Sequence, residues 1–232
     1  RSLSQNSRYE IELIDKGRDV ERRVCPRESG RSCVSCSPCN IHQGFGGAGT
    51  MSDGKLNYDT RIGNNLGEII SPEKNTRLTE EVEGIFRGYG ISTIENNVER
   101  ISALERTALQ KGIDFLGVRH AHVGSEKLRD LMIQMREDLI SNGVKISTKT
   151  EIRSPRDLKY DSLILATGRS GSEDMERFLE KEGIKYSYRP VDIGVRIEVP
   201  RRITDDITDF SRDMKFYILT KGGQRVRTFC AC

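Results

Sequence analysis

The first feature of the sequence that could support chemistry is a cluster of four cysteines. They have the spacing C-x7-C-x2-C-x2-C and are Cys25, Cys33, Cys36 and Cys39. Four thiolates in one loop could hold Zn²⁺, and the C-x2-C-x2-C run partly resembles an iron–sulfur binding run, although its fourth thiol lies upstream. A redox-active pair and a set of free thiols are the alternatives. Because the opening RSLSQNSRYE has no apolar signal core, we expect a reducing, cytoplasmic compartment.

A glycine-rich stretch follows the cysteines. GFGGAG matches G-x-G-x-x-G at Gly44, Gly46 and Gly49. The dinucleotide fingerprint requires a strand before the motif and a helix after it, whereas here a cysteine-rich loop precedes it and TMSDGKL follows. The stretch is therefore not the primary fingerprint. It predicts either a loop whose backbone N–H groups approach a phosphate or a flavin ring, or a flexible turn.

Asp15 ends the segment YEIELIDKG, whose alternation of apolar and polar residues predicts a strand. In a dinucleotide fold, the second strand ends in an acid about 20 residues after the glycine motif, and this acid binds the ribose. Counting back from Asp15 places that motif before Arg1. We therefore expect a first strand and glycine turn before the sequence given, and a further cofactor segment after FCAC at 229–232. An ordinary strand-end aspartate is the alternative.

Two other segments carry candidate residues. YDSLILATGRSG predicts a buried strand at 162–166 that ends in Ala-Thr-Gly, where small residues would let a cofactor pass close to the backbone. A buried strand with a tight turn is the alternative. His120 and His122 precede Gly124 and are expected to be loop histidines rather than catalytic ones.

The hydrophobic spacing predicts the elements that would position these residues. Helices are expected at 76–89, 95–111, 124–142 and 173–182, with Thr79 and Ser125 as caps of the first and third. Strands are expected at 144–147, 150–153, 162–166 and 184–198. Residues 214–230 predict an antiparallel pair that turns at 221–224.

Composition excludes several classes of protein. Of the 232 residues 35% are hydrophobic and 31% charged, which is too apolar for a disordered chain. No apolar run approaches the roughly 18 residues of a membrane span. The net charge of +3 gives no reason to expect nucleic acid or an anionic membrane as a partner.

Taken in order, these motifs resemble one family. IELIDKGRDVERR, the cysteine cluster, GFGGAGTMSDGKL, HVGSEKLRDLMIQMRE, DSLILATGRS, PVDIGVRIE and KGGQRVRTFCAC are similar to the poorly characterised FAD-dependent dehydrogenases of the glutathione-reductase-like FAD/NAD(P)-binding superfamily. The resemblance covers nearly the whole chain, and GGAGTMSDGKL and the FCAC ending are its specific parts.

The resemblance implies a site for non-covalent FAD, with NAD(P) as a further cofactor that the superfamily allows. Asp15 matches the ribose-binding acid, and Ile152 lies in the segment that meets the adenine. The glycine loop beside the flavin corresponds to Gly46, Gly47, Gly49, Ser52, Asp53, Gly54 and Lys55. The second pyrophosphate-side motif corresponds to Ala166, Thr167 and Gly168.

The sequence thus predicts an α/β fold with an incomplete Rossmann-like parallel sheet and a mixed, partly antiparallel substrate subdomain. We expect FAD-binding parts at 1–72 and 124–172, a helical segment at 73–123 and a β-rich substrate subdomain at 173–232. The function would be oxidation or reduction of an unidentified small molecule through FAD. No catalytic residue is identified; Arg196 could hold a carboxylate substrate, and His122 and Cys230 are weaker candidates. The alternatives are a non-enzymatic metal-binding module built on the cysteines and an inactive remnant.

Overall fold

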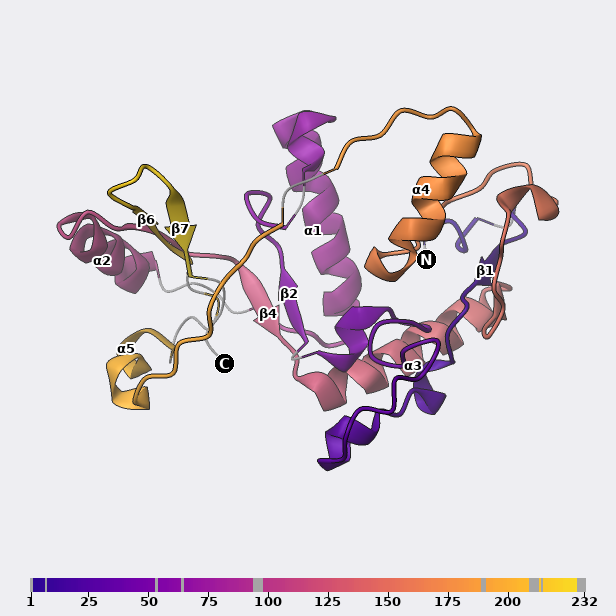
Figure 1. Cartoon of the computed structure of the whole chain (residues 1–232), viewed down its shortest axis with the longest axis horizontal. Helices are drawn as coiled ribbons and strands as arrows, with labels where there is room; N and C mark the ends of the chain where they lie inside the picture. Colours follow the sequence, from indigo (N-terminus) through magenta and orange to yellow (C-terminus); the bar gives the residue numbers. More distant parts are fainter. Residues whose placement is uncertain are drawn as a thin grey trace. The chain divides into compact units, whose positions relative to one another are not determined.

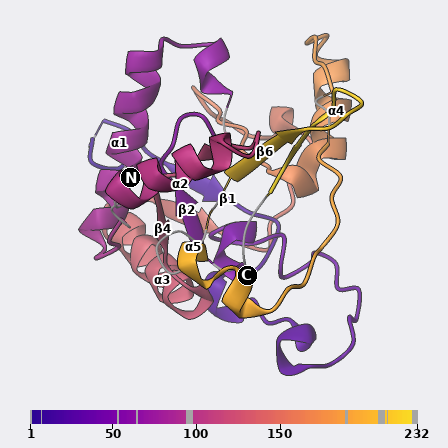
Figure 2. The same ribbon diagram turned by 90° about the vertical axis from the view of Figure 1, so that its left-hand side faces the viewer.

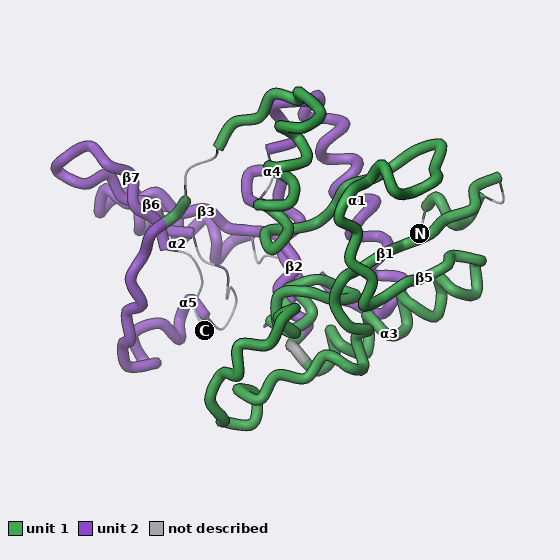
Figure 3. Tube along the Cα trace, turned by 45° about the vertical axis from the view of Figure 1, so that its right-hand side comes forward, with its two compact units in different colours: residues 1–54, 124–192 green, residues 55–123, 193–232 purple. Residues whose placement is uncertain are grey.

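The computed structural model describes residues 2–6, 8–52, 54–63, 65–93, 98–188, 191–208, 213 and 215–228. These residues form a mixed α/β fold with one small parallel and two small antiparallel sheets, drawn from two directions in Figure 1 and Figure 2. The chain divides into two units, each built from two separate stretches (Figure 3). Unit 1 comprises residues 1–54 and 124–192, and unit 2 comprises residues 55–123 and 193–232.

Unit 1 contains a parallel strand pair, β1 (Glu12–Ile14) and β5 (Lys145–Ser147). Helix α3 (Ser125–Ser141) immediately precedes β5, and helix α4 (Ser172–Lys181) follows it. Parallel strands cannot be joined by a tight turn, and here the intervening chain includes the cysteine-rich loop, the glycine loop and all of the first stretch of unit 2. The predicted strands that end at Asp15 and cover 144–147 are confirmed.

Unit 2 contains two antiparallel sheets. In the first, β2 (Lys55–Asn57) pairs with β4 (His120–His122). In the second, β6 (Lys215–Leu219) lies between β3 (Asp114–Leu116) and β7 (Arg225–Arg227). The last two strands confirm the predicted hairpin, whose turn is closed by the bond from the Gly223 N–H to the Thr220 carbonyl (2.9 Å).

The helices of unit 2 are α1 (Pro72–Gly88), α2 (Val98–Leu109) and the short α5 (Asp205–Thr208) among the residues described. Ala108 of α2 and Phe115 of β3 are buried in a small apolar core. Hydrophobic side chains from α2, α5 and β6 pack against these two residues, and Figure 2 shows α2 beside β6. The apolar periodicity of α2 thus serves to bury one helix face against the three-stranded sheet.

The four predicted helices are confirmed, but two of the predicted caps are wrong. The Ser71 hydroxyl caps α1 by accepting the Lys74 N–H (3.3 Å), and α1 therefore begins at Pro72. Thr79 lies inside α1, where its hydroxyl donates to the Asn75 carbonyl (2.9 Å). Gly124, with a φ of 81°, is the N-cap of α3, and Ser125 is already helical. Serine followed by proline is a good start signal, so the correct cap of α1 was visible in the sequence.

Three predicted strands are wrong. The described residues of 150–153, 162–166 and 184–198 form no strand, and side chains expected to be buried are exposed, such as Ile164 (74%) and Ile193 (93%). A period-two pattern specifies which side chains share a face, but a strand also needs a neighbour that bonds its N–H and C=O groups. No strand in the described part of the chain pairs with these segments. The only parallel pair among these residues is β1 with β5.

We also searched the described helices for a membrane span. None of them is both long enough and apolar enough to cross a bilayer.

Candidate functional site

Asp15 lies directly after β1, at the strand end where the sequence predicts a ribose-binding acid. Its backbone N–H donates to the Ser147 carbonyl (2.9 Å), and its carbonyl accepts the Thr150 N–H (3.0 Å). One carboxylate oxygen, Oδ1, accepts the Gly17 N–H at 2.7 Å. Among the described residues no donor reaches the other oxygen, Oδ2. The geometry therefore leaves one carboxylate oxygen available to a hydroxyl group of a ligand.

The turn after Asp15 is in direct backbone contact with the glycine loop. A Cβ on Gly17 would lie 2.3 Å from the Gly44 nitrogen, and one on Gly44 would lie 2.4 Å from the Arg18 carbonyl oxygen. Such distances leave no room for a side chain, so both positions require glycine. The Phe45 N–H donates to the same Arg18 carbonyl (3.0 Å). The strand-end acid and the start of the glycine loop are thus held together within unit 1.

The side chain of Arg23 is completely buried and fixes the path of the loop. Its guanidinium donates to four backbone carbonyls at 2.8–2.9 Å, those of Asn40, Ile41, Phe45 and Gly47. Burial lowers the pKa of Arg23, and the charge of Asp15 opposes this change. A guanidinium keeps its proton in proteins, so the carbonyl dipoles solvate a buried cation to which no carboxylate of the described residues is bonded.

Helix α3 supports the loop from the other side. Arg136 donates to the carboxylates of Asp19 (2.7 Å) and Glu21 (2.8 Å), and these hydrogen bonds raise the pKa of Arg136. Arg129 donates to the carbonyls of Glu21 (3.1 Å) and Arg23 (3.2 Å). The segment that carries Arg23 is thereby tied to a rigid helix.

The middle of the glycine loop is open. Gly46, Gly47 and Gly49 are exposed, whereas Phe45 and Thr50 on either side are buried. Gly46 and Gly47 have φ values of 88° and 70°, which favour glycine. A Cβ on Gly47 or Gly49 would meet no atom within 4 Å. We call residues 46–49 the glycine crown. A Cβ on Gly46 would lie 2.3 Å from Oγ1 of Thr50, so the open space lies beside Gly47 and Gly49 only.

Two buried polar atoms close to the glycine crown in sequence have no hydrogen-bond partner among the described residues. They are Oε1 of Gln43 and Oγ1 of Thr50. Buried polar groups are normally bonded, so unpartnered atoms at both ends of the loop are a feature that a bound polar ligand or water would explain.

The last residues of the predicted glycine loop belong to two different units. The Ser52 hydroxyl donates to the Gly49 carbonyl (2.7 Å), and Gly54, with a φ of 70°, closes the loop. Asp53 lies outside the described residues. Lys55 is the first residue of β2 in unit 2, where its ammonium lies 3.6 Å from Asp213. Asp15, Gly46, Gly47, Gly49, Ser52 and Gly54 thus belong to unit 1, and Lys55 belongs to unit 2.

The remaining predicted cofactor residues also lie in unit 1, without the predicted strands. Ile152 is half-buried in a segment that is not a strand. Ala166 and Thr167 are exposed, and Gly168, with a φ of 63°, leads into the helical turn that opens α4. The sequence Ala-Thr-Gly followed by a helix start is therefore present, although no sheet supports it.

The four cysteines are free thiols with different environments. Cys25 is buried, Cys33 is exposed, and Cys36 and Cys39 are half-buried. The Ser35 N–H donates to the Cys33 sulfur at 3.4 Å. In the described part of the chain, no three His, Cys, Asp or Glu side chains are grouped so that they could hold a metal ion. The Zn²⁺ and iron–sulfur sites therefore stay predictions.

The three weaker catalytic candidates gain no support from their surroundings. Arg196 is exposed and pairs with the exposed Glu198 at 3.2 Å. His122 is exposed on β4. Cys230 lies outside the described residues.

Unit 2 contains a cluster of buried ionisable side chains that sequence reasoning missed. Asp213 and Lys215 are about 99% and 98% buried, and the Lys215 ammonium donates to Oδ1 of Asp213 at 2.6 Å. The β2–β4 register places Lys55 opposite His122 and Asn57 opposite His120, so these side chains share one face of the ribbon. His120 is fully buried, with Nδ1 2.9 Å from the Val118 carbonyl.

We predict that His120 makes unit 2 acid-sensitive. Burial lowers the pKa of His120, with Asp213 opposing and Lys55 and His122 adding to the effect. Since the folded-state pKa lies below the unfolded value of about 6.5, protonation favours the unfolded chain. The contribution of neutral His120 to the free energy of unfolding is fully present above about pH 6.5, and it falls as the pH is lowered through that value. Urea midpoints measured by circular dichroism across this range should show the decline.

The matched substitutions are His120→Gln, which should flatten that pH dependence, and His122→Gln on the exposed end of the same strand. His122 makes only a small contribution to the pKa shift of His120, so His122→Gln should leave most of the pH dependence in place. An unchanged pH profile in His120→Gln would show that another group causes the decline.

Sequence reasoning also missed Arg23. Its signal is weak, because an arginine in a polar loop is ordinarily exposed. The Arg23 side chain is buried only because the cysteine-rich loop and the glycine crown fold over it. The spacing of residues in the sequence does not predict this folding.

Comparisons with known proteins give one distant relative and no family assignment. No protein-family profile matches the chain. An uncharacterised protein of Clostridium beijerinckii is 25% identical over 213 residues, covering 84% of the chain. The chain spans about one third of the length of that relative (33%).

Proposed function

We propose that the chain is the cofactor-binding part of an FAD-dependent oxidoreductase of the glutathione-reductase-like superfamily, acting on a small molecule. The observation that carries the proposal is the backbone contact between Gly17 and Gly44. This contact sets the strand-end acid beside a glycine loop within one unit.

The residues present in unit 1 fit the adenosine end and the phosphates of FAD. In the proposed complex, the free oxygen Oδ2 of Asp15 accepts a ribose hydroxyl. Gly47 and Gly49 of the glycine crown would approach the cofactor through their backbone, since a Cβ on either would meet no protein atom within 4 Å. The helix start at Gly168 would face the pyrophosphate, where N–H groups favour anions. β1 and β5 would be neighbouring strands of the superfamily's parallel sheet.

The bound flavin would supply hydride or electron transfer, and the chain's own residues supply position. Arg23 and α3 hold the loop so that little conformational entropy is lost when a ligand binds. The Asp15 carboxylate is already oriented by the Gly17 N–H.

We predict that Gly47→Ala abolishes FAD retention while Gly30→Ala does not. Both glycines have positive φ (70° and 75°), and a Cβ on either meets no protein atom within 4 Å. Both variants therefore carry the same backbone strain of about 1–2 kcal/mol. Only the Cβ on Gly47 would occupy the space reserved for the cofactor.

The measurement is the visible flavin absorbance that remains with the purified chain after incubation with FAD and gel filtration. Equal flavin retention by the two variants would contradict the role of the glycine crown. A wild-type chain that retains no flavin would contradict the proposed function itself.

A further inference from the structure

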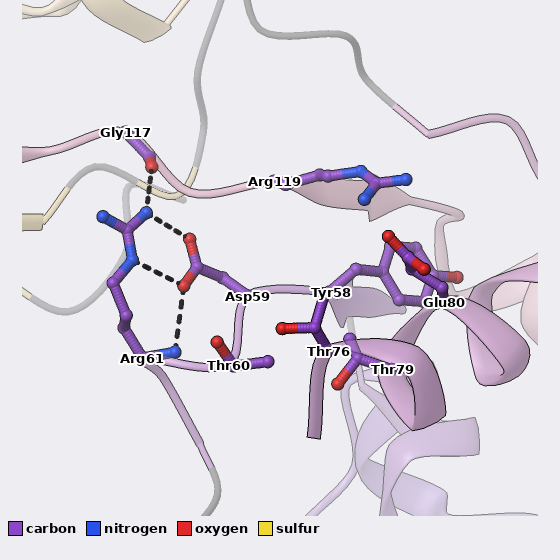
Figure 4. Close-up of a pocket in the computed structure, with 9 residues that line it drawn as sticks. All are labelled: Tyr58, Asp59, Thr60, Arg61, Thr76, Thr79, Glu80, Gly117 and Arg119. Carbon is purple, nitrogen blue, oxygen red and sulfur yellow. Dashed lines mark hydrogen bonds and ion pairs between the residues drawn. The ribbon is translucent and has the colours of Figure 1, made fainter. Parts of the chain in front are cut away.

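Unit 2 has a pocket of about 340 Å³ that is lined by none of the proposed cofactor residues (Figure 4). This volume lies at the lower end of the roughly 300–1,000 Å³ range of small-molecule sites. Three segments form its walls: the residues that follow β2, one face of α1, and the link between β3 and β4. The Tyr58 N–H donates to the Arg119 carbonyl (2.9 Å), which ties the first wall to the third.

Two charged residues that line the pocket, Asp59 and Arg61, form an ion pair with each other. Asp59 accepts three hydrogen bonds from Arg61, from its backbone N–H (3.0 Å), Nε (2.8 Å) and Nη2 (2.6 Å). Burial would raise the pKa of Asp59, but these bonds outweigh it and lower the pKa. Arg61 also donates to the Gly117 carbonyl (3.3 Å). The Asp59–Arg61 pair therefore forms a wall of the pocket with no net charge, and most of its hydrogen-bonding groups are already used within the pair.

Arg119 presents a cation with open donors. One terminal nitrogen, Nη2, donates to Oε2 of Glu83 on α1. Glu83 is about 98% buried and also accepts from Arg87 (2.9 Å), so it is shared between two guanidinium groups. No described residue accepts from Nε or Nη1 of Arg119, whose side chain is 44% exposed. Glu83 therefore holds one terminal nitrogen of the Arg119 guanidinium, and the donors on Nε and Nη1 stay available to a ligand.

Glu80 supplies the opposite charge. It projects from α1 on the same face as Thr76, four residues earlier, and both line the pocket. Glu80 forms no ion pair and Thr76 no side-chain hydrogen bond with any described residue. Figure 4 shows Arg119 and Glu80 on one side of the pocket and the Asp59–Arg61 pair on the other. Tyr58 adds no charge, because burial raises its pKa to about 12.

We propose that this pocket binds a small zwitterion of the free amino-acid type. The ligand carboxylate would bond the open donors of Arg119, and its ammonium would bond the carboxylate of Glu80. The Thr76 hydroxyl is available to a polar group on the ligand. A simple anion would satisfy only Arg119 and a simple amine only Glu80, so the pocket discriminates by requiring both charges.

The experiment titrates the full chain with L-serine, acetate and ethanolamine and follows binding by saturation-transfer NMR. L-serine should bind at least about tenfold more tightly than acetate or ethanolamine, since each of these lacks one charge-assisted contact. Glu80→Gln and Arg119→Met should each weaken L-serine binding by about tenfold or more. Glu80 is exposed, so Glu80→Gln is expected to fold normally.

Two variants serve as matched controls. Glu81→Gln changes the next residue of α1, which pairs with Arg77 (3.6 Å) outside the pocket lining. Arg87→Met removes the other guanidinium partner of Glu83 without changing the pocket lining. Both should bind L-serine as the wild type does. The proposal is overturned if L-serine does not bind, if acetate binds equally well, or if Arg87→Met weakens binding as much as Arg119→Met. None of these results depends on FAD.

Discussion

Replacing Arg23 by alanine should unfold the loops of unit 1 and abolish FAD binding. The substitution leaves four backbone carbonyls without their buried donor. An unsatisfied buried acceptor costs about 1–3 kcal/mol, and even partial access of water leaves a loss of about 3 kcal/mol or more in unfolding free energy. Since the Gly47 carbonyl belongs to the glycine crown and the Phe45 carbonyl lies just before it, the cofactor site should be lost together with stability. Urea unfolding followed by circular dichroism and flavin retention measure the two effects.

Two variants separate the role of Arg23 from a general effect of charge. Arg22→Ala removes a neighbouring exposed arginine and should change stability by less than about 0.5 kcal/mol. Arg23→Lys keeps the charge but lacks the planar fork that reaches four acceptors, so it should recover only part of the loss. If Arg23→Ala left both the unfolding midpoint and flavin retention unchanged, the central position of this residue would be wrong.

Replacing Asp213 by alanine should be the most damaging single change in unit 2. The carboxylate is about 99% buried, accepts the Lys215 ammonium at 2.6 Å and lies 3.6 Å from that of Lys55. Removing one partner of a buried ion pair takes an opposite charge away from the other, and this change costs about 3–5 kcal/mol. The expected result is a large fall in the urea midpoint.

The control variants separate the loss of the Asp213 charge from the loss of its side-chain volume. Asp213→Asn keeps the side-chain volume and should still lose much of the stability, because the ammonium groups of Lys215 and Lys55 lose the negative charge of this carboxylate. Asp206→Asn changes an exposed aspartate of α5 and should have little effect. A loss below about 1 kcal/mol in the free energy of unfolding for Asp213→Ala would show that water reaches this cluster of charged side chains.

The helices and the strand end at Asp15 could be predicted from sequence because their signals are local. In α3, the stripe that contains Leu128 and Leu131 matches the face that is buried. Helical hydrogen bonds form within one segment, so the pattern itself contains nearly all the information. The hairpin of β6 and β7 is similarly local, with its turn marked by Gly222 and Gly223.

The segments at 162–166 and 184–198 could not be predicted in this way. Their alternation is clear, but the partner of a strand can lie anywhere in the chain, and a sequence pattern does not name it. The described residues provide no partner, and apolar side chains such as Ile164 remain exposed.

The residues proposed for the cofactor site can be picked out in the sequence by their type, whereas the contacts that support them cannot. Asp15 stands out as an acid at a strand end and the glycine crown as a cluster of glycines, and their role in cofactor binding stays a prediction. The contact of Gly17 with Gly44, the bonds of Arg23 and the buried pair of Asp213 with Lys215 join residues whose spacing carries no period. Such contacts depend on how loops close in space.

The most direct test of the account is a titration of the wild type and Asp15→Asn with FAD and with FMN. Asparagine keeps the oxygen that accepts the Gly17 N–H and loses the free carboxylate oxygen proposed for the adenosine ribose. FMN has no adenosine, so it is the internal control. We predict that Asp15→Asn weakens FAD binding by about tenfold or more and leaves FMN binding unchanged. Equal FAD affinity in both proteins, or equal losses for FAD and FMN, would contradict the proposed site.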